Sequence, residues 1–291
     1  MNLHHLKIFH AVAQAGSISA GAERLHISQP AVTREIRELE NSLELPLFDR
    51  KPRGVTLTEG GQRLLDYAQR IFSLELAAER DLRDFAHLEL GELHLGASAT
   101  LGAYLLPPLI TAFRAQRPSI LVNLEVSNTR EVTRQLDEGR IALGFVEGHF
   151  QRANYGHRLL ARDALLPVVA PHHPLAGSAP LTAGQLQPYP LYLREPGSGT
   201  RASVEQAYRD HGLEARAGVA AGSTEALKRL LADGQGIAWL SRQAVDRELA
   251  NGELSSVPVH DLQIERELHA VWRLGSSLSP APAAFLALAA D

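Results

Sequence analysis

The chain has 291 residues with a formal charge of −4 at pH 7, and 45% of its residues are hydrophobic against 21% charged. These values are those of a soluble globular protein with two domains or one large domain. The chain contains no cysteine, which excludes disulfides, thiolate chemistry and cysteine-ligated metals. It starts with an amphipathic pattern instead of an apolar signal or anchor, so we expect a cytoplasmic protein without a membrane segment.

The first part of the chain predicts three short helices. Apolar residues recur at a helical period in residues 3–15, and Gly16 suits the left-handed position that ends such a helix. Ser17 suits the N-cap of a second helix, and Ser28 suits the N-cap of a third. Pro30 lies in the first turn of the third helix, where a missing N–H is tolerated. A DNA-reading helix-turn-helix fits this pattern, and an ordinary helical hairpin with a polar outer face is the alternative.

The third helix places glutamine, threonine and arginine away from its apolar face. Glutamine suits adenine, and arginine suits guanine or a phosphate, when the first turns of a helix enter the major groove. Residues 47–58 then predict a short β-hairpin with a basic tip, which can place cations on the DNA backbone or in the minor groove. The expected DNA contacts are Ser28, Gln29, Pro30, Thr33, Arg34, Arg37, Arg50, Lys51, Arg53 and Thr56.

Charge alone would not identify this region as DNA-binding. Residues 1–58 contain seven lysines and arginines against six acidic residues, so the segment lacks the large basic excess of a non-specific nucleic-acid binder. We therefore expect binding to depend on placed cations and on two or more copies, with an affinity that falls steeply with salt.

Residues 59–88 predict one long helix, capped by Thr58. Its apolar positions alternate at spacings of four and three, which is typical of a coiled-coil seam. The seam is formed by Leu64, Ala68, Ile71, Glu75, Ala78, Leu82 and Phe85, with Glu75 as its weak point. We expect a dimerisation helix, and twofold symmetry would imply a pseudo-palindromic DNA site. The alternative is a helix packed on its own domain.

From Gly91 onward short β-rich runs alternate with helices, which predicts an α/β domain with a largely parallel sheet. The first set comprises strands 92–96, 122–126 and 141–146 with helices 104–116 and 129–138. The second set comprises strands 165–169, 191–193, one near Val219, and 237–240, with helices 200–211 and 223–233. Strand 267–272 and helix 282–290 could return to the first set.

Four strand ends carry small hydroxyl or amide residues just before a helix. Ligands of open α/β sheets lie at such ends, and helix N-termini favour anions. Ordinary helix caps are the alternative for each segment taken singly. The expected effector contacts are Ser98, Thr100, Leu101, Asn128, Thr129, Glu195, Ser198, Gly199, Thr200, Arg201 and Ser223. Glu147 and Glu195 would repel a strongly charged anion unless Arg201 or a lysine compensates.

Residues 1–88 resemble the winged helix-turn-helix and linker helix of the LysR-type transcriptional regulators. The resemblance is carried by AERLHISQPAVTREIRELE, LPLFDR and RGVTLTEGGQRLL, in that order and at that spacing. Two positions depart from the family pattern. Gly21 stands where the family usually has alanine. Glu44 stands where it usually has glycine, so a non-glycine residue occupies an expected left-handed cap at a cost of about 1 kcal/mol.

The resemblance implies an α/β protein with an all-α winged head and a two-lobed effector domain similar to periplasmic binding proteins. The expected boundaries are 1–58 for the DNA-binding domain, 59–88 for the linker and 89–291 for the effector domain. Lobe one would comprise about 91–161 and 266–291, and lobe two about 162–265. The resemblance also implies a homodimer that assembles to a homotetramer on promoter DNA, with RNA polymerase open as a further partner.

The segment EPGSGTR, residues 195–201, resembles that of LysR-type regulators of sulfur assimilation, sulfite response and carbon fixation. It suggests sulfite or sulfate as effector, with a small carboxylate still open. The function expected is therefore effector-modulated DNA binding, without cofactor, metal or catalysis. A solute-binding protein for a small anion without a regulatory role is the alternative. A third possibility is an enzyme with a DNA-binding head, but the sequence contains no catalytic motif that would support it.

Overall fold

The computed structural model describes residues 1–51, 54–86, 91–275 and 278–289. For residues 50, 77, 80, 81 and 83–86 it describes the backbone alone. The chain divides into two compact units, Met1–Glu79 and Arg80–Asp291. In the described part of the chain, no helix is both long and apolar enough to cross a membrane.

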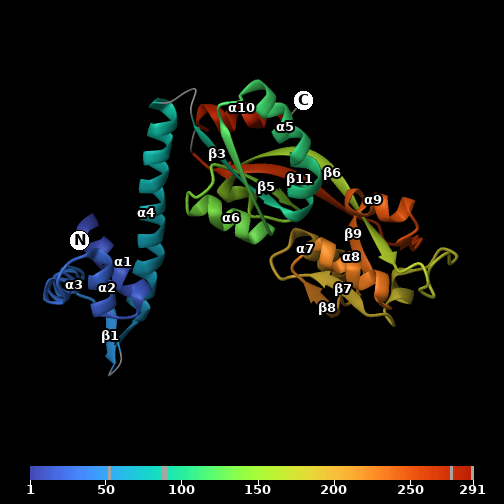
Figure 1. The fold of residues 1–291 in the computed structure, drawn as a ribbon. Helices are drawn as coiled ribbons and strands as arrows, with labels where there is room; N and C mark the ends of the chain where they lie inside the picture. Colours follow the sequence, from blue (N-terminus) through green and yellow to red (C-terminus); the bar gives the residue numbers. More distant parts are fainter. Residues whose placement is uncertain (52–53, 87–90, 276–277, 290–291) are drawn as a thin grey trace. The chain divides into compact units, whose positions relative to one another are not determined.

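The first unit is a three-helix head with a two-stranded wing (Figure 1). The wing strands pair antiparallel, and the buried side chains of the helices form one core around Phe9, Val12, Val32 and Leu39. The elements are α1 (Leu3–Ala15), α2 (Ile18–Leu25), α3 (Gln29–Leu43), β1 (Phe48–Lys51), β2 (Gly54–Leu57) and α4 (Glu59–Ala86).

The predicted helix ends and caps are present. Gly16 has a left-handed φ of 64°, and the side chains of Ser17 and Ser28 accept hydrogen bonds from the first turns of α2 and α3. Glu44 ends α3 with a φ of 51°, as predicted, and His26 ends α2 in the same conformation, which was not predicted. Two non-glycine residues of this small unit therefore hold a backbone conformation that glycine adopts without strain.

Gly21 is explained by the contact between α1 and α2. A Cβ atom at this position would lie 2.7 Å from Cγ2 of Val12 and 3.0 Å from its Cα. Such distances are too short for carbon atoms, so the helices could not approach this closely with alanine here. The departure from the family pattern at Gly21 thus accompanies a tight α1–α2 contact.

Helix α4 uses part of its apolar seam within its own unit. Ala68 is fully buried, and Leu64 and Ile71 pack against the core of the head. Further along the helix, Leu74 and Leu82 are 60% and 69% exposed. The packing on its own domain, considered above as an alternative, therefore holds for the amino-terminal half of α4. The side chain of Phe85 lies outside the described residues.

The second unit contains one large curled sheet and one small sheet. The large sheet has the order β10-β6-β11-β5-β3-β4, with β9 also paired to β6, and the small sheet pairs β7 with β8. The strands are β3 (Glu92–Ser98), β4 (Leu121–Ser127), β5 (Leu143–Glu147), β6 (Tyr155–Val169), β7 (Leu191–Arg194), β8 (Ala217–Ala221), β9 (Ala238–Ser241), β10 (Ser255–Ser256) and β11 (Ile264–Arg273).

The expectation of a largely parallel sheet is wrong for the large sheet. Strand β3 pairs parallel with β4 and β5, and β7 pairs parallel with β8. The long strands β6 and β11, however, pair antiparallel with each other, and β11 pairs antiparallel with β5. The direction of β11 depends on a partner more than a hundred residues earlier, which local periodicity does not register.

The helices of this unit follow the predicted order with two differences. The predicted helix 104–116 begins as a π-helical segment at Leu101–Leu105 before α5, and helix α9 was not predicted. Pro107 and Pro108 lie in the first turn of α5, where missing N–H groups are tolerated. The remaining elements are α5 (Leu106–Gln116), α6 (Thr129–Asp137), η2 (Arg152–Asn154), η3 (Ala183–Leu186), α7 (Gly199–Asp210), α8 (Thr224–Asp233), α9 (Arg242–Ala250) and α10 (Pro280–Leu288).

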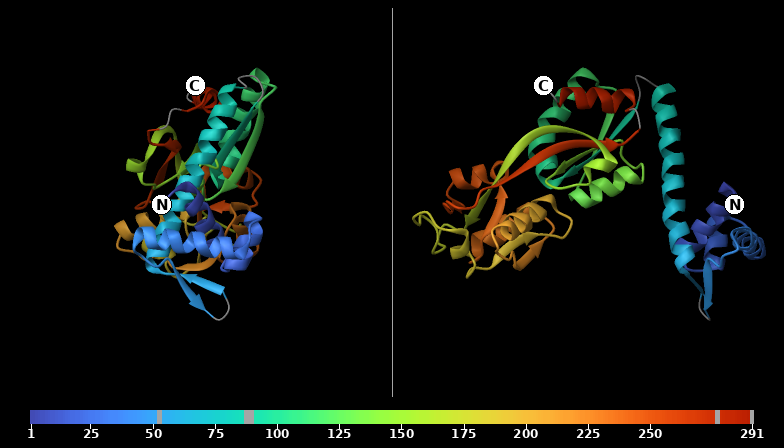
Figure 2. Two further views of the ribbon diagram at one scale, coloured as in Figure 1. Left: turned by 90° about the vertical axis from the view of Figure 1, so that its left-hand side faces the viewer. Right: turned by 180° about the vertical axis from the view of Figure 1, so that it is seen from behind.

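The two largest of the apolar cores described in this unit mark its two lobes. The core of lobe one brings Phe113 and Phe145 around Phe285 of α10, with ring centroids 5.3 and 5.8 Å from it. The core of lobe two includes Tyr208 and Trp239. Strands β6 and β11 run from one lobe into the other, as Figure 2 shows from two sides. The lobe boundaries given above stay a prediction.

Candidate DNA-reading surface and effector cleft

Helix α3 separates a buried face from an exposed polar face. Val32, Ile36 and Leu39 are buried in the core of the head. Of the expected DNA contacts on this helix, Gln29, Pro30, Arg34 and Arg37 are exposed and Thr33 is half-buried. A shallow hollow of about 610 Å³ is lined by Gln29, Pro30, Thr33, Arg34, Arg37 and Glu38.

The charged groups on this face differ in how firmly they are held. Arg34 is paired with Glu35 at 3.1 Å, and its hydrogen bond holds the pKa of the Glu35 carboxyl below its usual value. Arg37 has no ion-pair partner among the described side chains. The amide oxygen of Gln29 accepts a hydrogen bond from the Ser19 hydroxyl of α2 at 3.2 Å. The exposed polar face therefore offers an oriented amide and one uncommitted guanidinium.

The wing is joined to the helices by contacts that the sequence interpretation missed. Glu40 of α3 accepts hydrogen bonds from the backbone N–H groups of Leu47, at 2.7 Å, and Phe48, at 3.2 Å. Glu40 stands at the spacing of the apolar residues Ile36 and Leu43, which is the signal that could have identified it. These bonds set the position of β1 relative to α3.

A second joint lies at the start of β2. The N–H group of Val55 donates to the carbonyl oxygen of Gly16 at 2.9 Å, and a Cβ atom at Gly54 would lie 2.5 Å from the same oxygen. Lys51 and Thr56 of the wing are exposed. For Arg50 only the backbone is described, and Arg53 lies outside the described residues.

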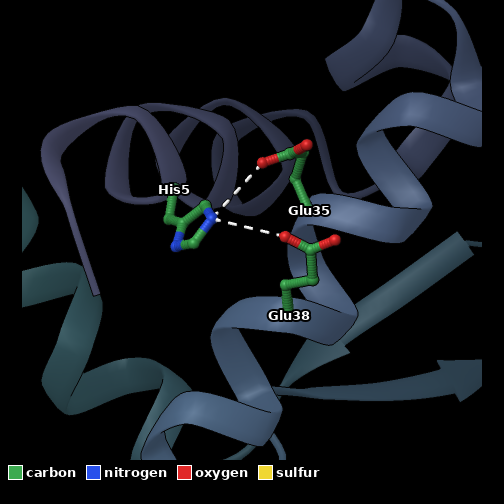
Figure 3. Close-up of side chains that lie close together, drawn as sticks. All are labelled: His5, Glu35 and Glu38. Atoms are coloured by element: carbon green, nitrogen blue, oxygen red, sulfur yellow. Dashed lines mark ion pairs between the residues drawn. The ribbon is translucent and has the colours of Figure 1, made fainter.

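An ion-pair cluster connects α1 with α3. His5 Nε2 lies 3.3 Å from a carboxylate oxygen of Glu35 and 3.9 Å from one of Glu38 (Figure 3). In the part of the chain that the structure describes, no other group of three such side chains could hold a metal ion. Arg34 also pairs with both carboxylates. The cluster fixes the polar edge of α3 against the start of α1.

The junction between the two lobes is built around a buried arginine. Arg266 of β11 pairs with the carboxylates of Glu147 and Asp163, at nitrogen–oxygen distances of 2.9 and 2.7 Å. The side chains of all three residues are only 1% exposed. Its guanidinium also donates to the hydroxyls of Thr100, at 2.9 Å, and Thr200, at 2.8 Å. A single cation thus connects the end of β3 in lobe one with the start of α7 in lobe two.

Glu147 lies at the centre of this junction. Its Oε1 accepts a hydrogen bond from the Thr200 hydroxyl at 3.0 Å, and its backbone carbonyl accepts one from the Thr129 hydroxyl at 3.1 Å. Burial would raise the pKa of the Glu147 carboxyl, but Arg266 and the nearby threonine hydroxyls outweigh burial and lower it. The carboxylate is therefore ionised at neutral pH.

The expected effector contacts converge on this junction but divide into three groups. Ser98, Thr100 and Thr200 are buried, and Leu101 is buried within the core of lobe one. Asn128, Glu195 and Ser223 line a cavity of about 410 Å³ on one side. Thr129, Ser198, Gly199 and Arg201 line a cavity of about 620 Å³ on another side.

The charges near the cleft are compensated by residues other than those expected. Arg201 pairs with Glu205 at 2.6 Å on its own helix instead of with Glu147. Glu195 is paired at 2.8 Å with the buried Arg194. Arg194 and Arg266, neither of them singled out in the sequence, therefore carry the role expected of Arg201. Each lies inside a strand, where a lone arginine gives no local signal of burial.

The capping alternative applies to some of the hydroxyl and amide residues and not to others. Asn128 and Ser223 accept hydrogen bonds from the first turns of α6 and α8, so both act as helix caps. Ser198 occupies the N-cap position of α7 without making a capping hydrogen bond. Among the described side chains, the buried hydroxyls of Ser98 and Ser198 and Oε2 of Glu147 have no hydrogen-bond partner. Buried polar atoms are rarely left in this state, so the junction has unused hydrogen-bonding capacity.

Comparison with known proteins shows two matching family models. Residues 3–62 match the model described as bacterial regulatory helix-turn-helix protein, lysR family. Residues 86–291 match the model described as LysR substrate binding domain. Together they cover most of the chain in the order expected from the sequence.

Three proteins illustrate the likeness. The RuBisCO operon transcriptional regulator of Allochromatium vinosum is 30% identical over 285 residues, which cover 98% of this chain and 94% of the relative. The crystal structure of CbnR with its target DNA has a TM-score of 0.68 at 24% identity and covers 99% of both chains, which shows the shared fold. The CcmR regulatory domain of Synechocystis PCC6803 in complex with 2-PG has a TM-score of 0.63 at 27% identity, and covers 68% of this chain and 95% of that one.

Proposed function

The chain belongs to the LysR family of transcriptional regulators, and from this premise we propose that α3 reads promoter DNA under the control of a small oxyanion bound between the lobes. In this role the protein would work in the cytoplasm, where it would meet promoter DNA. The effector would act by changing how the DNA-bound oligomer is arranged. RNA polymerase is a further proposed partner.

The exposed polar face of α3 supports the DNA-reading role. Gln29 is held by Ser19 and can present its amide to a base edge, while Arg37 is free for guanine or a phosphate. Wing cations would contact the backbone beside the groove. The proposed contacts are those expected from the sequence: Ser28, Gln29, Pro30, Thr33, Arg34, Arg37, Arg50, Lys51, Arg53 and Thr56.

Exposed apolar side chains on α4 support assembly. Tyr67, Leu74 and Leu82 are each at least 60% exposed on one helix. A second copy of α4 would cover such residues, and the head's small basic excess requires more than one copy for firm DNA binding. We propose a homodimer that assembles to a homotetramer on a pseudo-palindromic site.

The unpartnered oxygens at the lobe junction carry the effector proposal. Ser198 offers a hydroxyl donor at the N-terminus of α7, which favours anions, and Ser98 offers a second one at the end of β3. A small oxyanion would satisfy these groups, and the CcmR neighbour holds 2-PG. The proposed ligand class includes sulfite, sulfate, small carboxylates and phosphate esters. The proposed contacts are Ser98, Thr100, Leu101, Asn128, Thr129, Glu195, Ser198, Gly199, Thr200, Arg201 and Ser223.

DNA binding is tested by selection from a pool of random-sequence duplexes with the full chain. The recovered sequences should contain two related half-sites separated by about 10 base pairs or a multiple of that spacing. The logarithm of the binding constant for the selected sequence should fall linearly with the logarithm of the salt concentration. Recovery of no preferred sequence at low salt would contradict the DNA-reading role.

Effector binding is tested by thermal unfolding of the full chain with sulfite, sulfate, phosphate, 2-phosphoglycolate and small carboxylates. A ligand at a hundred times its dissociation constant stabilises the folded state by about 2.7 kcal/mol. The ligand that stabilises the chain should also change its affinity for the selected DNA. Stabilisation without any change in DNA affinity would instead favour a solute-binding protein with no regulatory role.

A further inference from the structure

We propose that Glu147 determines the specificity of the cleft: it admits oxyanions that carry a proton to donate to it and rejects fully deprotonated ones such as sulfate. This inference rests on the anion-binding function proposed above. It concerns which member of that ligand class the cleft accepts.

The two oxygens of the Glu147 carboxylate are in different situations. Oε1 is held by Arg266 at 2.9 Å and by the Thr200 hydroxyl at 3.0 Å. Oε2 is buried, and no described group donates a hydrogen bond to it. An ionised carboxylate oxygen can only accept a hydrogen bond, so the group that completes this site must be a donor.

The carboxylate cannot readily turn away from a ligand. A Cβ atom at Gly199 would lie 2.8 Å from Cγ of Glu147 and 1.9 Å from its carbonyl oxygen, so α7 packs directly on this residue. Thr129 holds the same carbonyl from the side of lobe one. Glu147 is thus fixed from both lobes while its Oε2 stays unsatisfied.

The surrounding groups add the opposite requirement. The hydroxyls of Ser98 and Ser198, 1% and 2% exposed, have no partner and can donate to the charged oxygens of an anion. The complete site therefore calls for a ligand with several acceptor oxygens and at least one donor. A monoprotonated phosphate ester, hydrogen sulfite or a hydroxy acid meets both requirements.

Sulfate fails the second requirement. Sulfate carries no proton at neutral pH, so one of its oxygens would face Oε2 of Glu147. Both oxygens are negatively charged acceptors, and neither can donate a hydrogen bond to the other. Sites that bind a ligand through its hydrogen-bond donor discriminate strongly against analogues that lack the donor. The buried carboxylate of Glu147 would therefore exclude sulfate by repulsion.

The first test is calorimetric titration of the wild-type full chain with inorganic phosphate and with sodium sulfate. We expect phosphate to bind about a hundredfold more tightly or better. The affinity for 2-phosphoglycolate should fall about tenfold for each pH unit above its second phosphate pKa of about 6, because the protonated form is the one bound. Equal affinities for phosphate and sulfate, or a phosphoglycolate affinity that rises with pH, would overturn the inference.

The second test compares Glu147→Gln with Glu205→Gln. A glutamine at 147 can donate to an oxyanion, so the preference for phosphate over sulfate should shrink to within about threefold. Glu205 lies on α7 at the edge of the cleft, and its neutralisation should raise both affinities by the same factor. An unchanged preference in Glu147→Gln would refute the role of Glu147.

The outcomes separate this inference from the proposal that it rests on. If phosphate, phosphoglycolate, sulfate, sulfite and small carboxylates all fail to bind the wild-type chain, the anion cleft itself is refuted. If phosphate and sulfate bind equally, the anion cleft stands and the selectivity of Glu147 is refuted. If Glu147→Gln fails to fold, the wild-type affinities and their pH dependence still decide the question.

Discussion

Replacing Arg266 by methionine should destabilise the second unit strongly at neutral pH. The substitution keeps most of the side-chain volume but leaves Glu147 and Asp163, both 1% exposed, without their shared cation. Removing one partner of a buried ion pair costs about 3–5 kcal/mol, because the remaining charge is buried and uncompensated. The hydroxyls of Thr100 and Thr200 lose a donor as well.

The pH dependence of this loss has a definite sign. In the wild type the pKa of Glu147 is lowered, so its contribution to stability is present above its unfolded pKa and disappears as the pH falls through the folded value. In Arg266→Met, burial acts without the cation and raises this pKa. Glu147 then takes up a proton as the pH falls from 7 toward 5, and the difference from wild type should shrink.

Urea denaturation followed by tryptophan fluorescence measures this effect directly. The chain contains two tryptophans, Trp239 in the core of lobe two and Trp272 beside that of lobe one, so the signal reports the second unit alone. The control is Arg162→Met on β6, since Arg162 is 70% exposed and lies 3.8 Å from its partner Glu267, with an expected loss of at most about 1 kcal/mol. A loss for Arg266→Met below about 1 kcal/mol at pH 7, or one that grows as the pH falls, would refute the reasoning.

Three further outcomes are expected. Arg37→Ala should weaken binding to the selected DNA by about 1–3 kcal/mol and reduce its salt dependence, whereas the exposed α1 residue Lys7, changed to alanine, should not; equal losses would remove Arg37 from the interface. Glu44→Gly should stabilise the head by about 1 kcal/mol, because glycine adopts the left-handed cap without strain. Circular dichroism should show the unfolding transition of the head at a higher urea concentration, whereas tryptophan fluorescence should not change. An unchanged midpoint in circular dichroism would mean that the cap is not strained. Gly199→Ala should abolish thermal stabilisation by anions while DNA still binds. The added Cβ would lie 1.9 Å from the carbonyl oxygen of Glu147 and keep the lobes apart. Unchanged stabilisation by anions would contradict the close packing of α7 on Glu147.

The head could be predicted almost completely from the sequence because its signals are local. A cap acts within one helical turn, and Gly16, Ser17 and Ser28 each contact the residues that follow or precede them closely in the chain. The strain at Glu44 could be predicted for the same reason. Glu40 escaped prediction because its partners, the N–H groups of the wing, become close to it only after the chain has turned back.

The lobe junction contains the residues that the sequence pointed to, but its ion pairs were not predicted, and its role as an effector cleft stays a prediction. The hydroxyl residues at strand ends were identified because the carboxyl edge of a sheet is a general property of α/β folds. Arg266 was missed because its partners lie 66 and 166 residues away at Thr200 and Thr100, and the register that brings them together is set by the long β6–β11 ladder. The same ladder reverses the direction of the returning strand, which explains why the sheet is mixed.

The position of β11 and α10 also governs when each unit can form during synthesis. The head and most of α4 lie within Met1–Glu79 and can fold once that segment leaves the ribosome, since domains emerge from the amino terminus first. Lobe one cannot be completed until β11 is made, because β11 lies between β5 and β6 and pairs with both strands. It also needs Phe285, whose ring fills its core. Until then two strands expose unpaired edges, which invite aggregation. A chain cut short before β11 would therefore retain a folded head attached to an incomplete second unit, and such fragments should be insoluble or rapidly degraded.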